Sequence, residues 1–223
     1  MRSAIGDVLP FAVVVAASPI NIIAAILLLF TKKPVANATS YLAGFVGGVM
    51  AVLCGAIVLA AAIDLSADST RSRGASALLL VSGVCLVVVA VRKFRGRPRP
   101  GEEAEMPTWM DGIAEFGQGK SFVLGVTVGA LNPKNIVVGV AAAVTIASAD
   151  LSVGQQLAVI AVYVVIACLG VAAPIVAMLV LGERSADVLD GWKSWLVRNS
   201  AAMMAVIYLL FGAILIGKGI GGI

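Results

Sequence analysis

Two matching six-residue stretches decide how the rest of the sequence is interpreted. They are Ser18-Pro19-Ile20-Asn21-Ile22-Ile23 and Asn132-Pro133-Lys134-Asn135-Ile136-Val137. Both follow one pattern, namely a small polar residue, proline, any residue, asparagine, isoleucine and an aliphatic residue. The second copy begins 114 residues after the first, and each lies near the middle of an apolar segment. The match predicts an internal repeat with the same polar, proline-containing element in each half.

The apolar segments around these stretches indicate a membrane protein. Of the 223 residues, 61% are hydrophobic and 13% are charged, whereas soluble domains are about 45 to 50% apolar and about 25% charged. A helix needs about 20 mostly apolar residues to cross a bilayer core. Six segments meet or approach this length, and they are residues 5–30, 38–63, 74–91, 121–147, 155–181 and 200–216. We therefore expect an all-α membrane protein with six transmembrane helices.

Three spans in each half would place the second half in the membrane in the opposite orientation to the first. We expect a first three-helix repeat over residues 1–91, a cytoplasmic basic and amphipathic loop over 92–120, and a second three-helix repeat over 121–223. Inverted repeats of this kind occur in many secondary transporters, in which broken helices meet at a binding site near the midplane. The proline-broken first and fourth helices are the candidates for such a site.

The distribution of Lys and Arg sets the expected orientation. Eleven of these residues lie in the first, third and fifth loops, and four lie in the termini and the second loop. Cytoplasmic loops carry such an excess, so both termini are expected outside. Lys32, Arg97 and Lys193 are then predicted to face the cytoplasm. Asp68 and Asp150 are predicted to face outward.

The long third loop combines a basic start with an apolar periodicity. Its first residues, from Arg92 to Arg99, are expected to lie against the anionic inner leaflet. Beyond Pro107 the apolar residues recur at helical spacing, which predicts a short amphipathic helix in the membrane interface. The apolar residues of this helix are Trp109, Met110, Ile113 and Phe116. We interpret the segment as a surface anchor rather than a substrate gate.

Each proline of the repeated element removes a hydrogen-bond donor from its helix. Pro19 cannot donate to the carbonyl of Val15, and Pro133 cannot donate to that of Gly129. A freed carbonyl in hydrocarbon is costly unless protein, water or a ligand satisfies it. Flanking polar groups can do so, which leaves a pair of locally capped kinks as one alternative, or they can bind a substrate. The candidate substrate-binding residues are Ser18, Pro19, Asn21, Asn132, Pro133, Lys134 and Asn135.

Lys134 strengthens the hypothesis of a substrate-binding site, because an ionisable residue at mid-membrane marks a functional site by default. No Asp, Glu or Arg lies in the interior of any predicted span. The charge must then be met by water, carbonyls, an anionic ligand or deprotonation, unless the side chain reaches the interface. We expect Lys134 to engage an acidic or phosphate-like head group while Asn21 and Asn135 hold adjacent polar groups.

Several classes of function are disfavoured by what the sequence lacks. Histidine is absent, which excludes a His-based catalytic triad and a His-ligated metal, so we expect no enzyme, no cofactor and no metal site. The Lys and Arg residues behind the net charge of +4 lie mainly in the loops between the spans, so we expect no nucleic-acid partner. A membrane thiol-disulfide electron carrier would need cysteines beside the proline breaks. The three cysteines, Cys54, Cys85 and Cys168, lie elsewhere and are interpreted as free core thiols.

Glycine spacing predicts close helix packing. Gly44 and Gly48, and likewise Gly125 and Gly129, have the GxxxG spacing that lets helices approach closely. The spacing leaves open whether these glycines pack within one chain or in a homo-oligomer.

The proline elements and their surroundings also resemble a known family. Gly125-Val-Thr-Val-Gly129-Ala-Leu-Asn132-Pro133-Lys134-Asn135, with Ala17-Ser18-Pro19-Ile20, is similar to the lysine exporter (LysE) superfamily. Within it the chain resembles the actinobacterial peptidoglycolipid addressing protein (GAP) family, which includes sulfolipid-addressing proteins. The approach from Pro107-Thr-Trp109 through Gly119-Lys120-Ser121-Phe122 to Gly125 carries this closer likeness.

The resemblance implies a function and a location. It implies export or outward delivery of a cell-envelope glycolipid, or of another small amphiphile, at the bacterial cytoplasmic (inner) membrane. The implied partners are membrane lipids, a small amphiphilic or anionic substrate, and lipid-export machinery or a second copy of the chain. An amino-acid or small-solute exporter and a non-transporting accessory subunit of a lipid export complex remain alternatives. No intramembrane acid offers proton coupling, which leaves the energy source open.

Overall fold

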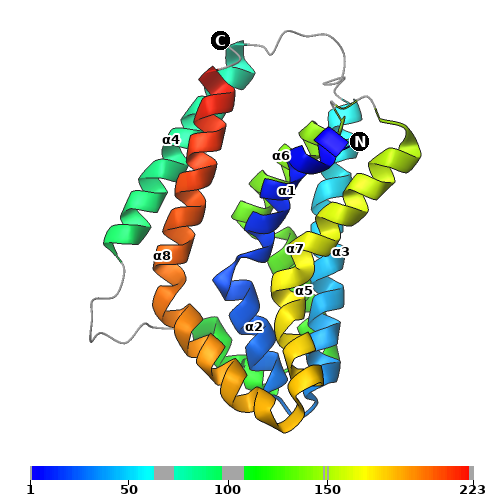
Figure 1. The fold of residues 1–223 in the computed structure, drawn as a ribbon, viewed down its shortest axis with the longest axis vertical. Helices are drawn as coiled ribbons and strands as arrows, with labels where there is room; N and C mark the ends of the chain where they lie inside the picture. The colour runs from blue at the N-terminus through cyan, green and yellow to red at the C-terminus, as the bar shows by residue number, and fades with distance from the viewer. Residues whose placement is uncertain (1, 63–72, 97–107, 148, 150, 221–223) are drawn as a thin grey trace. The chain divides into compact units, whose positions relative to one another are not determined.

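The computed structural model describes residues 2–62, 73–96, 108–147, 149 and 151–220, and these contain helices and no strand (Figure 1). The α-helices are α1 (Arg2–Ala16), α2 (Pro19–Leu29), α3 (Pro34–Ala62), α4 (Arg73–Arg95), α5 (Gln118–Ala130), α6 (Pro133–Ala147), α7 (Val153–Leu181) and α8 (Ser185–Ile220). Two 3-10 helices, η1 (Thr108–Glu115) and η2 (Gly182–Arg184), connect them. The predicted all-α class is therefore confirmed for the described part of the chain. Asp68, Arg97 and Asp150, whose sides of the membrane were predicted, lie outside the described residues.

Two stretches are long and apolar enough to cross a membrane. They are Pro34–Leu59, within α3, and Val153–Gly217, which runs through α7, η2 and most of α8. Two further candidates arise if the bent pairs α1 with α2 and α5 with α6 each count as one span, which gives two to four spans among the described residues. The arrangement with six spans stays a prediction.

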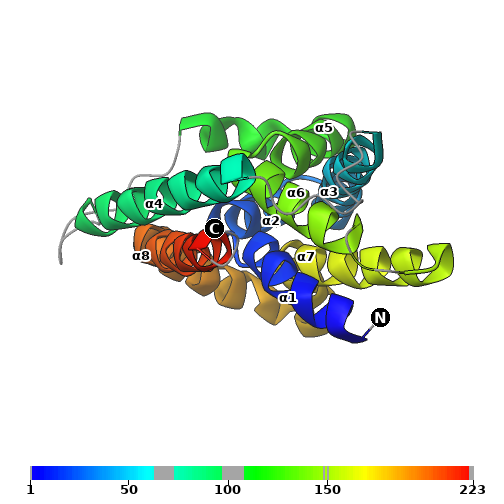
Figure 2. The same cartoon turned by 90° about the horizontal axis from the view of Figure 1, so that it is seen from above.

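One compact unit comprises residues Met1–Ser66 and Pro107–Lys193. In it α3 packs along α5 and α6, whereas α1 and α2 pack along α7, and α1 also contacts α6. Figure 2, which views the molecule from above, shows α3 beside α5 and α6. Large side chains fill the interior of this unit, and Tyr41, Phe45 and Tyr163 are each no more than 1% exposed.

Glycines bring α3 and α5 close together. A Cβ atom on Gly44 would meet the backbone carbonyl of Phe122, and one on Gly125 would meet that of Tyr41. The second glycine of each motif repeats the pattern, because a Cβ on Gly48 or on its partner in α5 would lie 2.7 Å from a carbonyl oxygen of the facing helix. The two GxxxG motifs therefore pack against each other within one chain.

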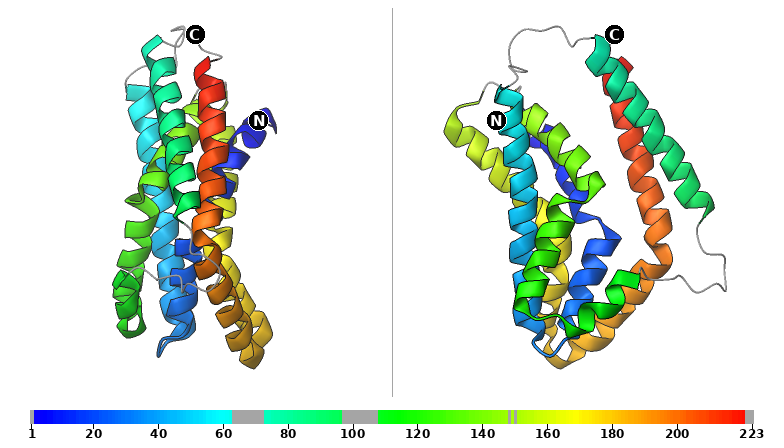
Figure 3. Two further views of the ribbon diagram at one scale, coloured as in Figure 1. Left: turned by 90° about the vertical axis from the view of Figure 1, so that its left-hand side faces the viewer. Right: turned by 180° about the vertical axis from the view of Figure 1, so that it is seen from behind.

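The second compact unit comprises residues Ala67–Met106 and Ser194–Ile223. Its helices, α4 and the part of α8 from Ser194 onward, lie side by side and antiparallel (Figure 3, right). A Cβ atom on Gly83 would lie 2.8 Å from the carbonyl oxygen of Gly212, and the reverse distance is also 2.8 Å. The two units do not follow the divisions expected at residues 91 and 120. The division into repeats concerns sequence symmetry, which this packing does not test, and it stays a prediction.

The amphipathic segment of the third loop packs on protein. Residues Thr108–Glu115 form a 3-10 helix rather than an α-helix, and η1 contacts α2. Met110 and Ile113 are 3% and 0% exposed. The periodicity thus identified the apolar side, and protein covers these two residues of it, while the position of the segment in the membrane interface stays a prediction. A pattern of apolar residues shows which face is covered and does not show what covers it.

Candidate functional site at the two helix breaks

Each break arises because a small polar residue followed by proline starts a new helix. Ser18 precedes α2, which begins at Pro19, and Asn132 precedes α6, which begins at Pro133. Proline is favoured at the first helical position, where its missing N–H is not needed. The backbone N–H of Lys134 donates to Asn132 Oδ1 at 3.1 Å, which is the hydrogen bond of an N-terminal cap. The chain bends by 52° at the first break and by 59° at the second.

The backbone hydrogen bonds on either side of the breaks match between the halves. The last bond before the first break joins the N–H of Ala17 to the carbonyl of Val13, and the first bond after it joins Ile22 to Ser18. The counterparts 114 residues later are Leu131 to Thr127 and Ile136 to Asn132. The backbones of the two polar elements thus fold alike, although Ser18 forms no side-chain cap and Asn132 does.

At the second break, an asparagine of the same polar element donates to carbonyls at the end of α5. Asn135 is 3% exposed, and its Nδ2 lies 3.0 Å from the carbonyl oxygen of Val128 and 3.3 Å from that of Gly129. Gly129 is the residue whose carbonyl Pro133 cannot serve. Its carbonyl is therefore satisfied by a local side chain, as the alternative of capped kinks required.

At the first break, a side chain from the other half of the chain donates a hydrogen bond to a carbonyl near the end of α1. Lys134 is 8% exposed, and its Nζ donates to the carbonyl oxygen of Val14 at 2.8 Å. Val14 lies one residue before Val15, the carbonyl that the sequence singled out. No Asp or Glu in the described part of the chain forms an ion pair with Lys134. A backbone carbonyl is thus the partner that the described residues give to this charge.

The side chain of Asn21 is buried without a hydrogen-bond partner in the described part of the chain. It is 1% exposed, and neither its Nδ2 nor its Oδ1 has a hydrogen-bond partner among the described residues. Its backbone carbonyl accepts a hydrogen bond of 3.3 Å from the hydroxyl of Tyr41. Asn135 Oδ1 is likewise without a partner there. Buried polar groups are nearly always hydrogen-bonded, so these orphaned atoms call for an explanation.

The structure brings together part of the predicted set. Lys134 links the second break to the end of α1, and five of the seven residues are buried, namely Ser18, Pro19, Asn21, Lys134 and Asn135. Asn132 is partly exposed and Pro133 is exposed.

Sequence reasoning missed the carbonyl of Val14 and the hydroxyl of Tyr41. No sequence signal identifies the carbonyl as an acceptor for Lys134. The tyrosine carried a weak signal, because a tyrosine inside an apolar segment must place its hydroxyl somewhere.

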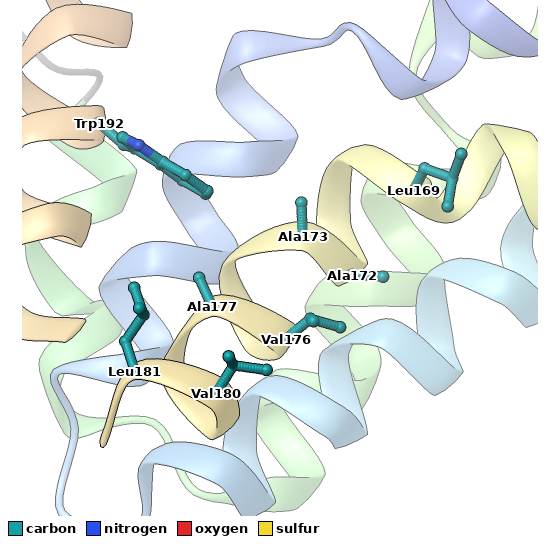
Figure 4. Close-up of a pocket in the computed structure, with 8 residues that line it drawn as sticks. All are labelled: Leu169, Ala172, Ala173, Val176, Ala177, Val180, Leu181 and Trp192. Carbon is teal, nitrogen blue, oxygen red and sulfur yellow. The ribbon is translucent and has the colours of Figure 1, made fainter.

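An apolar groove of about 470 Å³ lies elsewhere in the same unit. Figure 4 shows Trp192, from the start of α8, pointing toward α7, which supplies the other lining residues. These are Leu169, Ala172, Ala173, Val176, Ala177, Val180 and Leu181. None of them belongs to the breaks. The lining suits a hydrocarbon chain.

The described residues bear on two other kinds of site, a metal site and a disulfide site. They contain no group of three or more His, Cys, Asp or Glu residues placed to hold a metal ion. The three cysteines are free, and Cys54, Cys85 and Cys168 lie on α3, α4 and α7, outside the helices that form the breaks.

Comparison with known proteins identifies a family. The family model described as Sap, sulfolipid-1-addressing protein, matches residues 8–221. The match covers both helix breaks and nearly all of the described residues. No curated protein and no solved structure matches the chain.

Proposed function

Because the chain belongs to the sulfolipid-1-addressing protein family, we propose that it is a membrane transporter that exports a lipid with an anionic head group. The substrate class is a cell-envelope glycolipid, delivered outward across the bacterial cytoplasmic membrane through the site at the two helix breaks. The family description names a sulfolipid. An acidic head group of that kind is what a buried ammonium group binds by charge-assisted hydrogen bonds.

The observation that carries the proposal is the environment of Lys134. On insertion scales, a lysine at a helix centre costs about 2.5 to 3.5 kcal/mol. Here the ammonium is buried, bonds to the carbonyl of Val14, and has no carboxylate partner among the described residues. An ammonium has three N–H donors, so one carbonyl leaves donors for a ligand. An anion bound at this point would supply the missing counter-charge.

Other features of the same compact unit fit the rest of such a lipid. Asn21 offers both a donor and an acceptor, and Asn135 offers an acceptor. These groups suit the hydroxyls of a sugar head group. The apolar groove beside Trp192 suits a hydrocarbon chain. An amino-acid exporter would need a polar site and would make no use of that groove.

We further propose that the transporter has six spans in two inverted repeats, with both termini outside, and that it belongs to the LysE superfamily, and the helix contacts support the repeat. The broken pair α5 and α6 packs on α3, and the broken pair α1 and α2 packs on α7. If α7 is the counterpart of α3, these two contacts are equivalent. The pairing of α4 with α8 then joins the third helices of the two halves. Matching bonds at the breaks favour the same symmetry.

The test uses purified protein in liposomes. The probes are an isotope-labelled lipid with a sulfated sugar head group and a neutral lipid with the same chains. We expect the wild type to move the sulfated lipid faster. Lys134→Met should remain folded and move it at least about tenfold more slowly, because a hydrogen bond to a charged group contributes about 1.5 to 3 kcal/mol. Lys120→Met, which removes an exposed charge on α5, should transport normally.

Two results would count against this function. Wild-type transport rates from well-folded Lys134→Met would remove Lys134 from the mechanism. A wild-type protein that moves neither lipid, although its loss from cells alters their envelope lipids, would favour the accessory-subunit alternative.

A further inference from the structure

The two breaks have matching backbone hydrogen bonds, but different side chains donate to the carbonyls that precede them. In the second half, Asn135 donates to the carbonyl of Val128, which lies seven residues earlier. The residues with the same spacing in the first half are Asn21 and Val14. There the ammonium of Lys134 occupies the carbonyl, and the buried amide of Asn21 has no partner in the described residues.

We propose that Asn21 and Lys134 are alternative hydrogen-bond donors to the carbonyl of Val14. When an anionic head group binds Lys134, the side chain of Asn21 replaces Lys134 as the donor to this carbonyl. The exchange rests on the proposed function, because it needs a ligand that competes for the ammonium. In the free protein Lys134 caps α1. In the loaded protein Lys134 holds the anion, while Asn21 caps α1 as Asn135 caps α5.

The geometry makes this exchange feasible. The bonds of Asn135 show that an asparagine at this position after such a break reaches the carbonyl seven residues earlier. The bend differs little between the breaks, at 52° and 59°. The hydroxyl of Tyr41 holds the backbone of Asn21. Only side-chain rotation is then needed, and side-chain rotamer changes are fast compared with helix movements.

The exchange also explains why a buried amide without a partner is tolerated. A polar group buried without a hydrogen bond is penalised, so the free state carries this penalty at Asn21. Anion binding would relieve the penalty and would never leave the carbonyl of Val14 without a donor. Part of the cost of moving Lys134 off its carbonyl is thereby offset, which favours loading of the site.

A double-mutant cycle tests the exchange without measuring transport. The melting temperature of the purified protein is compared for the wild type, Asn21→Leu, Lys134→Met and the double variant. Asn21→Leu alone should leave the melting temperature unchanged or raise it, because it removes a buried amide that makes no bond. In the Lys134→Met background the same change should lower it by about 3 °C or more, because Val14 then loses its second donor.

Asn135→Leu is the matched control. It removes the donor from Val128, and its effect should be equal with Lys134 and with Met at position 134. A structure of the Lys134→Met variant gives a second readout, in which Asn21 Nδ2 should lie within hydrogen-bonding distance of the carbonyl oxygen of Val14. This readout decides the question if the double variant does not fold.

The outcomes separate this proposal from the function on which it rests. Additive effects of Asn21→Leu and Lys134→Met, or an Asn21 side chain that stays away from Val14 in the single variant, would overturn the exchange and leave transport through Lys134 intact. A coupled cycle together with wild-type transport by Lys134→Met would support two alternative donors and overturn the role of the anion.

Discussion

Lys134 Nζ donates a 2.8 Å hydrogen bond to the carbonyl oxygen of Val14, a residue 120 positions earlier in the chain. This bond joins the start of α6 to the last turns of α1. It makes one side chain both the cap of a broken helix and the only cation placed at the breaks in the described part of the chain. A ligand that bound the ammonium would therefore act on the structure of α1 as well.

Replacement of Asn135 should destabilise the protein. Asn135→Leu removes the donor from two carbonyls, of Val128 and Gly129, and a buried group left without a partner costs about 1 to 3 kcal/mol. The melting temperature in detergent should fall by several degrees. Asn199→Leu is the control, because the Nδ2 of Asn199 bonds to Trp195 in an exposed position. Equal shifts in the two variants would show that the bonds of Asn135 contribute nothing special.

A single methyl group should disrupt the contact between α3 and α5. Gly44→Ala places a Cβ against the backbone carbonyl of Phe122, which cannot move aside as a side chain can. Overpacking of this kind typically costs about 1 to 3 kcal/mol. The monodisperse fraction in size-exclusion chromatography should fall. Gly55→Ala on the same helix has open space around it and should be neutral or stabilising, and a similar loss there would contradict this view of the interface.

The side of the membrane that the first and fifth loops face can be measured by labelling. The ammonium of Lys193 lies 5.6 Å from the ring centroid of Phe30, next to the first loop, so both loops should share one side. In a variant without native cysteines, Lys32→Cys and Lys193→Cys should react with a membrane-impermeant maleimide only after the cells are opened. Asp150→Cys should react in intact cells. Labelling of position 32 but not 193 in intact cells would contradict the structure as well as the topology.

Asn37 should hold η1 against the helices. Its Nδ2 lies 2.8 Å from Thr31 Oγ1 and 2.8 Å from the carbonyl oxygen of Phe116, and the side chain is buried. Asn37→Leu should speed hydrogen exchange at the amides of residues 110–116, because regions that lose buried contacts open more easily. Thr39→Val removes an exposed hydroxyl bonded only within α3 and should leave that exchange unchanged. Unaltered exchange in Asn37→Leu would show that η1 is held by its apolar contacts.

The local features of the site could be predicted from the sequence, whereas its long-range contacts could not. Serine or asparagine followed by proline is a signal for the start of a helix, and α2 and α6 do begin at Pro19 and Pro133. The bond to the carbonyl of Gly129 also follows from local geometry. The hydrogen-bond partner of Lys134 does not follow from local geometry, because it depends on how α6 packs against α1.

Glycine spacing also shows that local features could be predicted and long-range contacts could not. The spacing of Gly44 and Gly48 predicts a close approach to another helix and says nothing about which helix. The partner is α5, which is reached only after the third loop. The periodicity of η1 likewise predicted an apolar side, but the surface that covers Met110 and Ile113 is protein. In each case the missing information was the identity of the neighbour.

The composition of the first compact unit has a consequence for biosynthesis. Helices α1, α2 and α3 find packing partners in α5, α6 and α7, so these first three helices leave the ribosome well before α5 and α6 exist. During that interval the glycine surface of α3 has no partner from its own chain, and Lys134 is not available to Val14. The nascent first half must be held by the insertion machinery or by lipid until the fourth predicted span arrives. Mutations that weaken the contact between α3 and α5 should therefore expose the newly made chain to membrane proteases.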